Sequence, residues 1–269
     1  NDLSMTAVKD TLASIPGEHN YIYVRTPLGE DEEKNYDEIT FYDGLGRELD
    51  FAQSYGADRA GAIMAHHHLI EYDSLGRKEK QWLSTNTSFS YMSPEDLKGG
   101  VLWDYHDAGK RSYLQTNYES SPLNRITEQY GVGDAWGDHP ARMEYLTNIP
   151  ADSLRCSFYF IDDNDSLIRR GDYRSGELQV TKATDEDGKP TYTFVDKQGR
   201  TLLTRLGRGN QQADTYFVFD RFGRIRYVLP PMINDEISAG NLDLYAYQYL
   251  YDSFGRCISK KLPGCAAIG

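Results

Sequence analysis

The chain has 269 residues, of which 39% are hydrophobic and 13% aromatic, and its formal net charge is −12. This composition is that of a globular protein with a substantial core, and it argues against a disordered chain. The acidic excess, with no basic run to offset it, argues against binding to nucleic acid or to an anionic membrane. No apolar stretch approaches the roughly 18 residues that span a bilayer, so we expect no membrane insertion.

Three segments are expected along the chain. Residues 1–18 show little periodicity and are interpreted as a leader segment that ends near Pro16-Gly17. Residues 19–150 and residues 151–269 form two β-rich lobes, with Asn148-Ile149-Pro150 as the boundary. Because the chain starts at Asn1 rather than Met, we expect that any export signal was removed or never included.

In the first lobe, runs of β-forming residues predict strands at residues 21–24 and 36–41, with a polar connection at 29–35. The alanine-rich residues 57–65 predict a short helix or a loop. Residues 83–150 are the least regular. Within them, Ser93 followed by Pro94 predicts the start of a short helix, and residues 105–110 resemble a decayed hairpin turn.

In the second lobe, strands are predicted at residues 157–161, 178–181, 192–195, 215–219 and 245–251. The acidic segments 162–165 and 185–188 lack the spaced ligands of a calcium loop, so we interpret both as hairpin tips. Pro230-Pro231 must end the strand that follows Arg224, because proline cannot donate to a ladder of hydrogen bonds.

One short pattern, aromatic–Asp–x–x–Gly–Arg, recurs along the chain. Four good copies begin at Tyr42, Tyr72, Phe219 and Tyr251, and a worn copy begins at Val195. Asp with Gly three positions later is typical of a type I turn that a left-handed Gly closes, which is a common three-residue hairpin loop. The predicted structural turn residues are Asp43, Gly46, Arg47, Asp73, Gly76, Arg77, Asp196, Gly199, Arg200, Asp220, Gly223, Arg224, Asp252, Gly255 and Arg256.

This turn sets a register in which each Asp lies opposite its Arg. Apolar residues then meet across the strands in six pairs: Phe41 with Leu49, Ile39 with Phe51, Phe219 with Ile225, Phe217 with Tyr227, Phe194 with Leu202, and Leu250 with Ile258. The second copy is an exception, because the same register sets Glu71 against Glu79. Either that hairpin is exposed there or it slips by one residue.

The pattern is similar to the YD repeat of RHS-type proteins, large bacterial proteins related in repeat pattern to the Tc-toxin cocoon and to animal teneurins. More closely, the chain resembles the N-terminal segment of unknown function that precedes the RHS repeats in surface or secreted proteins of Gram-negative bacteria. Short matches between residues 20 and 265 carry this resemblance: Asn20-Tyr21-Ile22, Thr26-Pro27-Leu28, Ser121-Pro122-Leu123-Asn124-Arg125, Asp214-Thr215-Tyr216, Tyr227-Val228-Leu229-Pro230-Pro231 and Lys261-Leu262-Pro263-Gly264.

The resemblance implies an all-β fold of antiparallel hairpins in a curved, shell-like sheet with a few short helices. It implies a non-enzymatic scaffold, whose partner is the rest of a longer RHS-type chain and whose location is the cell surface or the outside of the cell. The sequence contains no RHS-associated core, no self-cleaving protease stretch and no toxin module. We therefore expect a fragment of a longer protein or a naturally shortened one.

A second hypothesis comes from another class of function. Trp82, Trp103 and Trp136 could form a stacking platform for a glycan, in a carbohydrate- or cell-surface-binding module. Packing within a β-sheet explains the same residues, because aromatic side chains are common on strands. Exposure of a pair of them would favour the glycan hypothesis.

Reactive groups form no recognisable site. His66 and His68 have a spacing that can share a metal, but the sequence indicates no third ligand. Cys156, Cys257 and Cys265 lack metal spacing, and free thiols are favoured over a disulfide between the last two. There is no Gly-x-Ser-x-Gly elbow, and Gly207-Arg208-Gly209 lacks the setting of a phosphate-binding loop. We expect no cofactor and no metal. A carbohydrate-degrading activity is the one enzymatic alternative.

Overall fold

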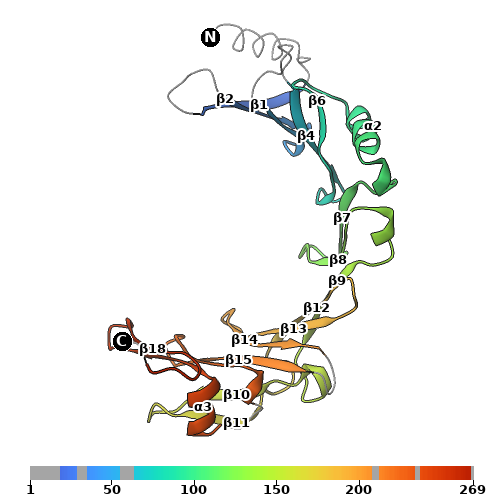
Figure 1. Ribbon diagram of the computed structural model, residues 1–269. Helices are drawn as coiled ribbons and strands as arrows, with labels where there is room; N and C mark the ends of the chain where they lie inside the picture. Colours follow the sequence, from blue (N-terminus) through green and yellow to red (C-terminus); the bar gives the residue numbers. More distant parts are fainter. Residues whose placement is uncertain (1–18, 29–34, 55–63, 208–211, 234–236, 268–269) are drawn as a thin grey trace. The chain divides into compact units, whose positions relative to one another are not determined.

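The computed structural model describes residues 19–28, 35–54, 64–207, 212–233 and 237–267. In these residues the protein is all-β with a few short helices, which confirms the predicted fold class. The chain divides into two compact units, residues 1–140 and 141–269 (Figure 1). This division precedes the expected boundary at residue 150, because strand β9 (Ala141–Thr147) pairs with β12 (Gln179–Thr184) of the second unit.

The sheet of the first unit is antiparallel, in the order β1-β2-β3-β4-β5-β7-β8, and β6 pairs with β4. Apart from β6, which pairs with β4, each strand lies beside the next strand along the chain, so most of the sheet is a series of hairpins. Its strands are β1 (Asn20–Pro27), β2 (Asn35–Tyr42), β3 (Glu48–Ser54), β4 (Met64–Tyr72), β5 (Lys78–Trp82), β6 (Thr85–Ser88), β7 (Tyr113–Tyr118) and β8 (Ile126–Tyr130).

The predicted helix of the first unit is α2 (Pro94–Asp104). Its cap is Ser93, whose side chain accepts a hydrogen bond from the backbone N–H of Asp96, and Leu97 and Val101 are buried on its inner face. The predicted hairpin turn at residues 105–110 is wrong. The chain instead forms the 3-10 helix η1 (His106–Ala108), which continues directly from the end of α2. A second 3-10 helix, η2 (Asp134–Trp136), follows β8.

The main sheet of the second unit is also antiparallel, in the order β9-β12-β13-β14-β15-β16-β17-β18. Strands β10 and β11 form a separate two-stranded sheet. The remaining elements are η3 (Asp152–Leu154), β10 (Ser157–Ile161), β11 (Leu167–Asp172), β13 (Pro190–Val195), β14 (Thr201–Leu206), β15 (Ala213–Phe219), β16 (Ile225–Leu229), η5 (Pro231–Ile233), α3 (Ala239–Tyr245), β17 (Tyr247–Tyr251) and β18 (Cys257–Lys261).

Each unit has its own core. In the first unit the core contains Ile39, Phe41, Ala52, Ala65 and Phe89. In the second unit it lies between the main sheet and the β10–β11 hairpin, where the ring centroids of Tyr159 and Tyr216 are 4.8 Å apart. Arg205 is buried at this junction and ties the two layers together. Its guanidinium binds both carboxylate oxygens of Asp214 and donates to the carbonyl oxygens of Ser153 and Arg155.

Most of the predicted strands are present, and β10 has the predicted bounds. Pro230-Pro231 ends β16, as expected. Residues 245–246 are not in a strand, because α3 extends to Tyr245 and β17 starts at Tyr247. The irregular stretch also contains β6, β7, β8 and β9, which the sequence did not predict. The predicted leader, most of the connection at 29–35, the alanine-rich residues up to 63, and Arg208-Gly209 lie outside the described residues.

Candidate functional site: the hairpin turns and the contacts between them

The five predicted turns share one backbone geometry. In the first, the N–H of Asp43 donates to the carbonyl of Arg47 at 2.9 Å, and the N–H of Gly46 donates to the carbonyl of Asp43 at 3.0 Å. Gly46 has a φ of 77°, in the left-handed region that glycine tolerates best. The other four copies repeat both hydrogen bonds and the positive φ of the glycine. These are type I turns closed by a left-handed glycine.

The Asp side chain organises each turn. One carboxylate oxygen of Asp43 accepts from the backbone N–H groups of Leu45 and Arg47, and the other binds the Arg47 guanidinium. The hydrogen bond from the Arg47 backbone, with that from its side chain, lowers the pKa of Asp43. At Asp73, partial burial opposes ionisation, but hydrogen bonds from the backbone and side chain of Arg77 outweigh it and lower the pKa. The Asp is therefore a charged structural element.

The predicted register is wrong beyond the turn, because each hairpin has a further bulge. Tyr42 pairs with Glu48, but Phe41 pairs with Asp50, so Leu49 has no partner across the strands. The same one-residue shift occurs after the other four predicted turns. Of the six predicted apolar pairs, Phe219 with Ile225 is correct, because it lies on the turn side of the bulge. The other five are off by one: Phe41 with Asp50, Ile39 with Ala52, Phe217 with Val228, Phe194 with Leu203, and Leu250 with Ser259.

The second copy shows why this shift matters. The predicted clash between Glu71 and Glu79 does not occur, because Glu71 pairs with Lys80 instead. The hairpin therefore slips by one residue, which was one of the two alternatives left open. A bulge of this kind also increases the local twist of the strands.

The turn between β7 and β8 is a copy that the sequence pattern missed. The N–H of Glu119 donates to the carbonyl of Arg125 at 3.0 Å, and the Arg125 guanidinium binds both carboxylate oxygens of Glu119 at 2.7 Å. Asn124, with a φ of 54°, takes the place of the glycine. Hydrogen bonds from Arg125 and Ser121 lower the pKa of Glu119 to about 2. The signal was available as an aromatic-acid pair, Tyr118-Glu119, followed by Asn-Arg.

Both acidic segments of the second unit are hairpin tips, as predicted. At Asp162 and Asp185 the tip repeats the two backbone hydrogen bonds of the turn and the binding of N–H groups by the Asp carboxylate. Asp165 replaces the glycine of the first tip, with a φ of 66°. Its carboxylate binds the guanidinium of Arg226, at 2.5 and 2.9 Å, and links the β10–β11 hairpin to the main sheet.

The turn arginines connect successive hairpins. The guanidinium carbon of Arg47 lies 4.5 Å from the ring centroid of Tyr72, the aromatic residue that begins the next copy of the motif. Arg77 covers Tyr118 at 4.6 Å, Arg200 covers Phe219 at 5.1 Å, and Arg224 covers Tyr251 at 4.9 Å. We call these four contacts the arginine ladder. Each is a cation–π contact between one hairpin and the next.

Hydrogen bonds reinforce the ladder. The Tyr72 hydroxyl donates to the carbonyl of Glu48, the residue after Arg47, at 2.7 Å. In the next step the Tyr118 hydroxyl donates to the carbonyl of Lys78, the residue after Arg77, at 3.0 Å. Arg77 also donates through Nη1 to the carbonyl of Glu119 at 2.9 Å. The aromatic residue and the arginine of the motif thus act between hairpins, whereas Asp and Gly act within one.

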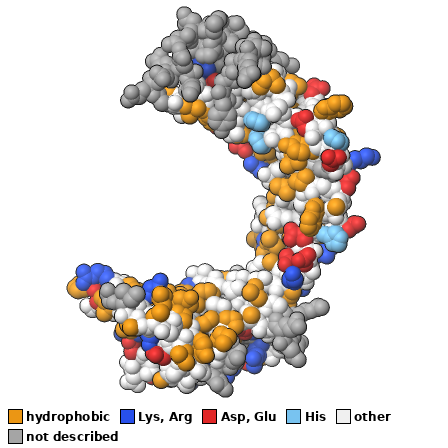
Figure 2. Space-filling model, in the orientation of Figure 1, with side chains coloured by type: hydrophobic (Ala, Val, Ile, Leu, Met, Phe, Trp, Pro, Cys, Tyr) orange, Lys and Arg blue, Asp and Glu red, His pale blue; other side chains and the backbone are white. Residues whose placement is uncertain are grey.

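The tips themselves carry exposed apolar side chains. The residue before the turn glycine is Leu45, Leu75, Phe222 or Phe254 in the four good copies, and these side chains are 65–85% exposed. Other hydrophobic side chains are visible on the surface of both units (Figure 2). Such exposure is unusual at turns, which polar residues dominate.

The three tryptophans have different surroundings. Trp82 is partly buried, donates to Glu71 at 2.8 Å and contacts the ring of Tyr113. Trp103 is 82% exposed on α2, and Trp136 is 47% exposed in η2. The structure therefore leaves two of the three predicted glycan-stacking residues on the surface and uses the third in packing.

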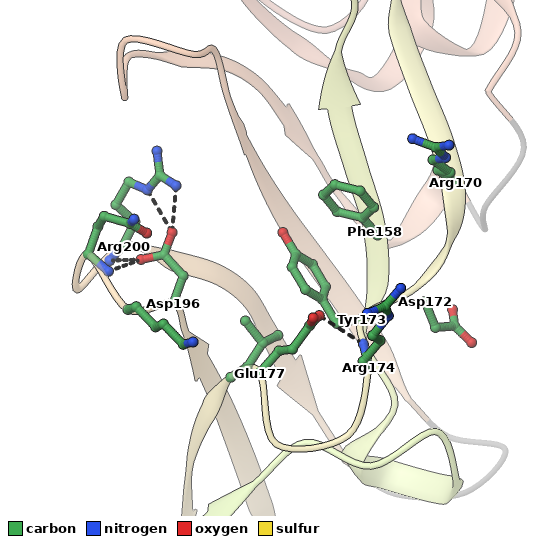
Figure 3. Close-up of a pocket in the computed structure, with 11 residues that line it drawn as sticks. Phe158, Arg170, Asp172, Tyr173, Arg174, Glu177, Asp196 and Arg200 are labelled. Atoms are coloured by element: carbon green, nitrogen blue, oxygen red, sulfur yellow. Dashed lines mark hydrogen bonds and ion pairs between the residues drawn. The ribbon is translucent and has the colours of Figure 1, made fainter.

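The described residues of the second unit form an open pocket of about 680 Å³ (Figure 3). Tyr173 lies between Phe158 and the Asp196–Arg200 turn, and the Glu177 carboxylate accepts from the backbone N–H of Arg174. Its lining includes no Ser, Cys or His. Burial raises the pKa of Tyr173 well above its usual value, and Asp196 is bound to Arg200. The pocket therefore lacks a Ser–His or Cys–His pair for nucleophilic catalysis.

The remaining reactive residues are dispersed or bound within the fold. His67 is buried, and its ring nitrogens lie 2.6 Å from Asp50 Oδ2 and 3.0 Å from the Ser88 carbonyl. His66 is exposed, whereas His68 is partly buried, which lowers its pKa. Cys156, Cys257 and Cys265 are free thiols, and burial raises the pKa of Cys156 to about 12. No group of three potential metal ligands occurs in the part of the chain that the structure describes.

Comparison with known proteins gives a family match and a fold match. Residues 20–147 match a family described as a domain of unknown function, DUF6443. The fold is similar to a chain in the crystal structure of TcdB2-TccC3, with a TM-score of 0.55 and 13% sequence identity over 93% of this chain. It is equally similar to a chain of the Photorhabdus luminescens Tc holotoxin pore, with a TM-score of 0.56 and 12% identity over 93% of this chain. No curated protein sequence matches the chain.

The likeness to these solved structures concerns the fold. The chain spans 12% and 11% of the two matched chains. None of the described helices is long and apolar enough to cross a membrane.

Proposed function

We propose that this chain is a non-enzymatic structural segment of a larger RHS-type protein, in which its hairpins form part of a curved shell or an exposed region. The arginine ladder carries this proposal. Asp and Gly of each motif shape one turn, and in four of the five motif turns the Arg contacts the aromatic residue of the next hairpin. The repeated residues are thus engaged in building and stacking hairpins.

The character of the pocket and the comparisons support the same function. The pocket of about 680 Å³ has no Ser, Cys or His in its lining, so it lacks a Ser–His or Cys–His pair for nucleophilic catalysis. The matched solved structures belong to Tc toxin assemblies, whose chains are several times longer than this one. We place the protein at the cell surface or outside the cell, with the rest of a longer RHS-type chain as its partner.

The test uses the longest reading frame that contains this chain. If the segment helps to enclose or support the rest of the protein, replacing Arg47 and Arg77 by alanine should make the regions outside residues 1–269 more accessible to protease. The matched control is Arg221→Ala, a turn arginine that contacts the ring of Phe222 within its own turn. Protease protection that is the same in the ladder variant and the wild type would contradict the proposal.

A glycan-binding module is the second candidate, because Trp103 and Trp136 are exposed. The comparisons give it no support. Screening on a glycan array tests it: a saturable signal that Trp103→Ala or Trp136→Ala abolishes, and that a Trp82→Phe control retains, would support this function. No signal on the array would eliminate it.

A further inference from the structure

The pocket of the second unit contains three cationic side chains that the fold does not neutralise. Arg170, Arg174 and Lys197 line this pocket, and none of their side chains makes an ion pair or a hydrogen bond within the described residues. The neighbouring Arg169, by contrast, lies 3.6 Å from the carboxylate of Asp172. The pocket therefore offers open positive charge in a chain whose net charge is −12.

The three cations come from two sides of the pocket. Arg170 lies on β11 and Arg174 just after it, whereas Lys197 lies in the turn between β13 and β14. In Figure 3, Arg170 and Arg174 lie across the pocket from the turn that contains Asp196 and Arg200. A ligand that occupies the pocket therefore lies between positive charges from both sides.

An aromatic face with a free hydroxyl separates these two sides. The rings of Phe158 and Tyr173 pack against each other, with their centroids 4.8 Å apart, and Figure 3 shows Tyr173 between Phe158 and the turn. The Tyr173 hydroxyl has no hydrogen-bond partner in the part of the chain that the structure describes. Burial raises the pKa of Tyr173, so the hydroxyl keeps its proton and is available as a donor.

We propose that this pocket binds an acidic peptide segment, in which an Asp or Glu lies beside an apolar residue. The inference goes beyond the proposed function and does not depend on it. A peptide carboxylate binds the guanidinium of Arg170 or Arg174 through two parallel N–H groups, and the apolar side chain packs on Phe158 and Tyr173. The Tyr173 hydroxyl donates to a backbone carbonyl of the peptide. The volume of the pocket lies within the range of about 300–1,000 Å³ that is usual for ligand sites.

The fold itself shows how such a carboxylate is bound. Arg226 holds both carboxylate oxygens of Asp165, at 2.5 and 2.9 Å, and this pair joins the β10–β11 hairpin to the main sheet. Arg25 holds both oxygens of Asp37 in the same way, at 2.7 and 2.9 Å. The two pocket arginines have the same donors and no carboxylate. A peptide carboxylate supplies the missing half of a contact that this chain uses to join its own segments.

The carboxylates of the pocket decide which class of anion fits. Asp172 and Glu177 also line it, and the Glu177 carboxylate accepts from the backbone N–H of Arg174. A polyphosphate or a polysulfated glycan carries negative charge at every unit and meets these carboxylates at close range, which is repulsive. A peptide brings N–H donors for them as well as a carboxylate for the arginines. The mixed charge of the lining therefore favours a peptide over a polyanion.

A peptide array tests the class of ligand. The intact chain is applied to acetylated hexapeptides that vary in charge and apolar content, with heparin fragments and polyphosphate on the same array. Peptides with an acidic residue beside an apolar one should give the strongest saturable signals. The double variant Arg170→Gln, Arg174→Gln should lose this preference. The matched control Arg221→Gln changes an arginine outside this pocket and should keep it.

Two results on the array would overturn the inference. One is the absence of any preference for acidic peptides in the wild-type chain. The other is a stronger signal from heparin or polyphosphate than from every peptide, because the pocket would then select for charge alone.

Fluorescence anisotropy with the best acidic peptide assigns the contacts. Arg170→Gln or Arg174→Gln should each weaken binding about three- to tenfold, as loss of a partly exposed charge-assisted contact implies. Tyr173→Phe removes only the hydroxyl and should weaken binding about two- to fivefold. The melting temperatures should match that of the wild type, because the removed groups have no partners within the described residues. An affinity that is the same in all three variants and the wild type would place the peptide elsewhere and overturn the inference.

Discussion

The guanidinium of Arg47 lies 4.5 Å from the ring centroid of Tyr72, so a residue that closes one turn contacts the residue that opens the next. The contact is partly exposed, since the Arg47 side chain retains 33% of its accessible surface. A double-mutant cycle of Arg47→Ala and Tyr72→Leu should give a coupling free energy of about 0.5–1 kcal/mol, the usual range for such contacts. Urea unfolding of the four proteins measures it. Additive effects of the two changes would show that the Arg47–Tyr72 contact contributes nothing to stability.

The left-handed glycine of the turn can be tested against a glycine beside it. A Cβ at either Gly46 or Gly44 would meet nothing within 4 Å, but only Gly46 has a positive φ, of 77°. Gly46→Ala should therefore lower the free energy of unfolding by about 1–2 kcal/mol. Gly44→Ala should change it by less than about 0.5 kcal/mol. Equal effects in chemical denaturation would argue against the turn geometry described above.

The turn between Glu119 and Arg125, which does not match the sequence pattern, can be tested at Asn124. Asn124 has a φ of 54° in the position of the motif glycine. Asn124→Gly should keep or slightly raise the free energy of unfolding, whereas Asn124→Ala should lower it by about 1 kcal/mol, because alanine resists the left-handed region. The midpoint of thermal unfolding distinguishes the two variants. A stable alanine variant would remove residues 118–125 from the set of motif turns.

Arg205 should be the most sensitive charged residue of the second unit. Its side chain is 2% exposed and binds Asp214, Ser153 and Arg155. Arg205→Met should cost about 3–5 kcal/mol, because it leaves the Asp214 carboxylate and two carbonyl groups without their donor. Lys189→Met removes an ion pair with Asp187 in which both side chains are exposed. It should lower the free energy of unfolding by less than about 1 kcal/mol. Calorimetry of both variants gives the comparison.

Acid should destabilise the fold through the turn carboxylates. Hydrogen bonds from Arg125 and Ser121 lower the pKa of Glu119 to about 2. Hydrogen bonds from Arg47 and Arg256 likewise lower the pKa values of Asp43 and Asp252. A carboxylate whose pKa is lower in the folded state stabilises the fold above its unfolded pKa of about 4, and this stabilisation is lost as the pH falls through the folded value. The melting temperature should therefore fall between about pH 5 and pH 2.

The variant Glu119→Gln isolates one of these carboxylates. It should melt at a lower temperature than the wild type at pH 7, and the difference should shrink toward pH 2, because the wild type loses the same interaction by protonation. Arg125→Gln breaks the same pair from the other side and should behave alike. A difference between wild type and variant that stays constant over this range would show that the Glu119–Arg125 pair does not contribute to the acid dependence.

The sequence by itself determined the turns, because their physics is local. Asp43, Gly46 and Arg47 lie within five residues, and the hydrogen bonds that they make need no other part of the chain. The same holds for the helix start at Ser93 and for the strand break at Pro230. The motif turns recur along the chain, and β-forming residues lie on both sides of each turn. These two features were enough to predict an all-β fold of antiparallel hairpins.

Only the tertiary structure decided how the hairpins meet. The bulge that pairs Phe41 with Asp50, and the contact between Arg47 and Tyr72, depend on packing and twist between strands that no spacing in the sequence specifies. The Glu119–Arg125 turn does not match the sequence pattern because its loop is longer than that of the other motif turns. Its acid–arginine pair and its residue with a positive φ nevertheless close the hairpin in the same way. Hydrogen bonds between residues close in sequence can be inferred from the sequence. Contacts between distant residues can be assigned only when the positions of both strands are known.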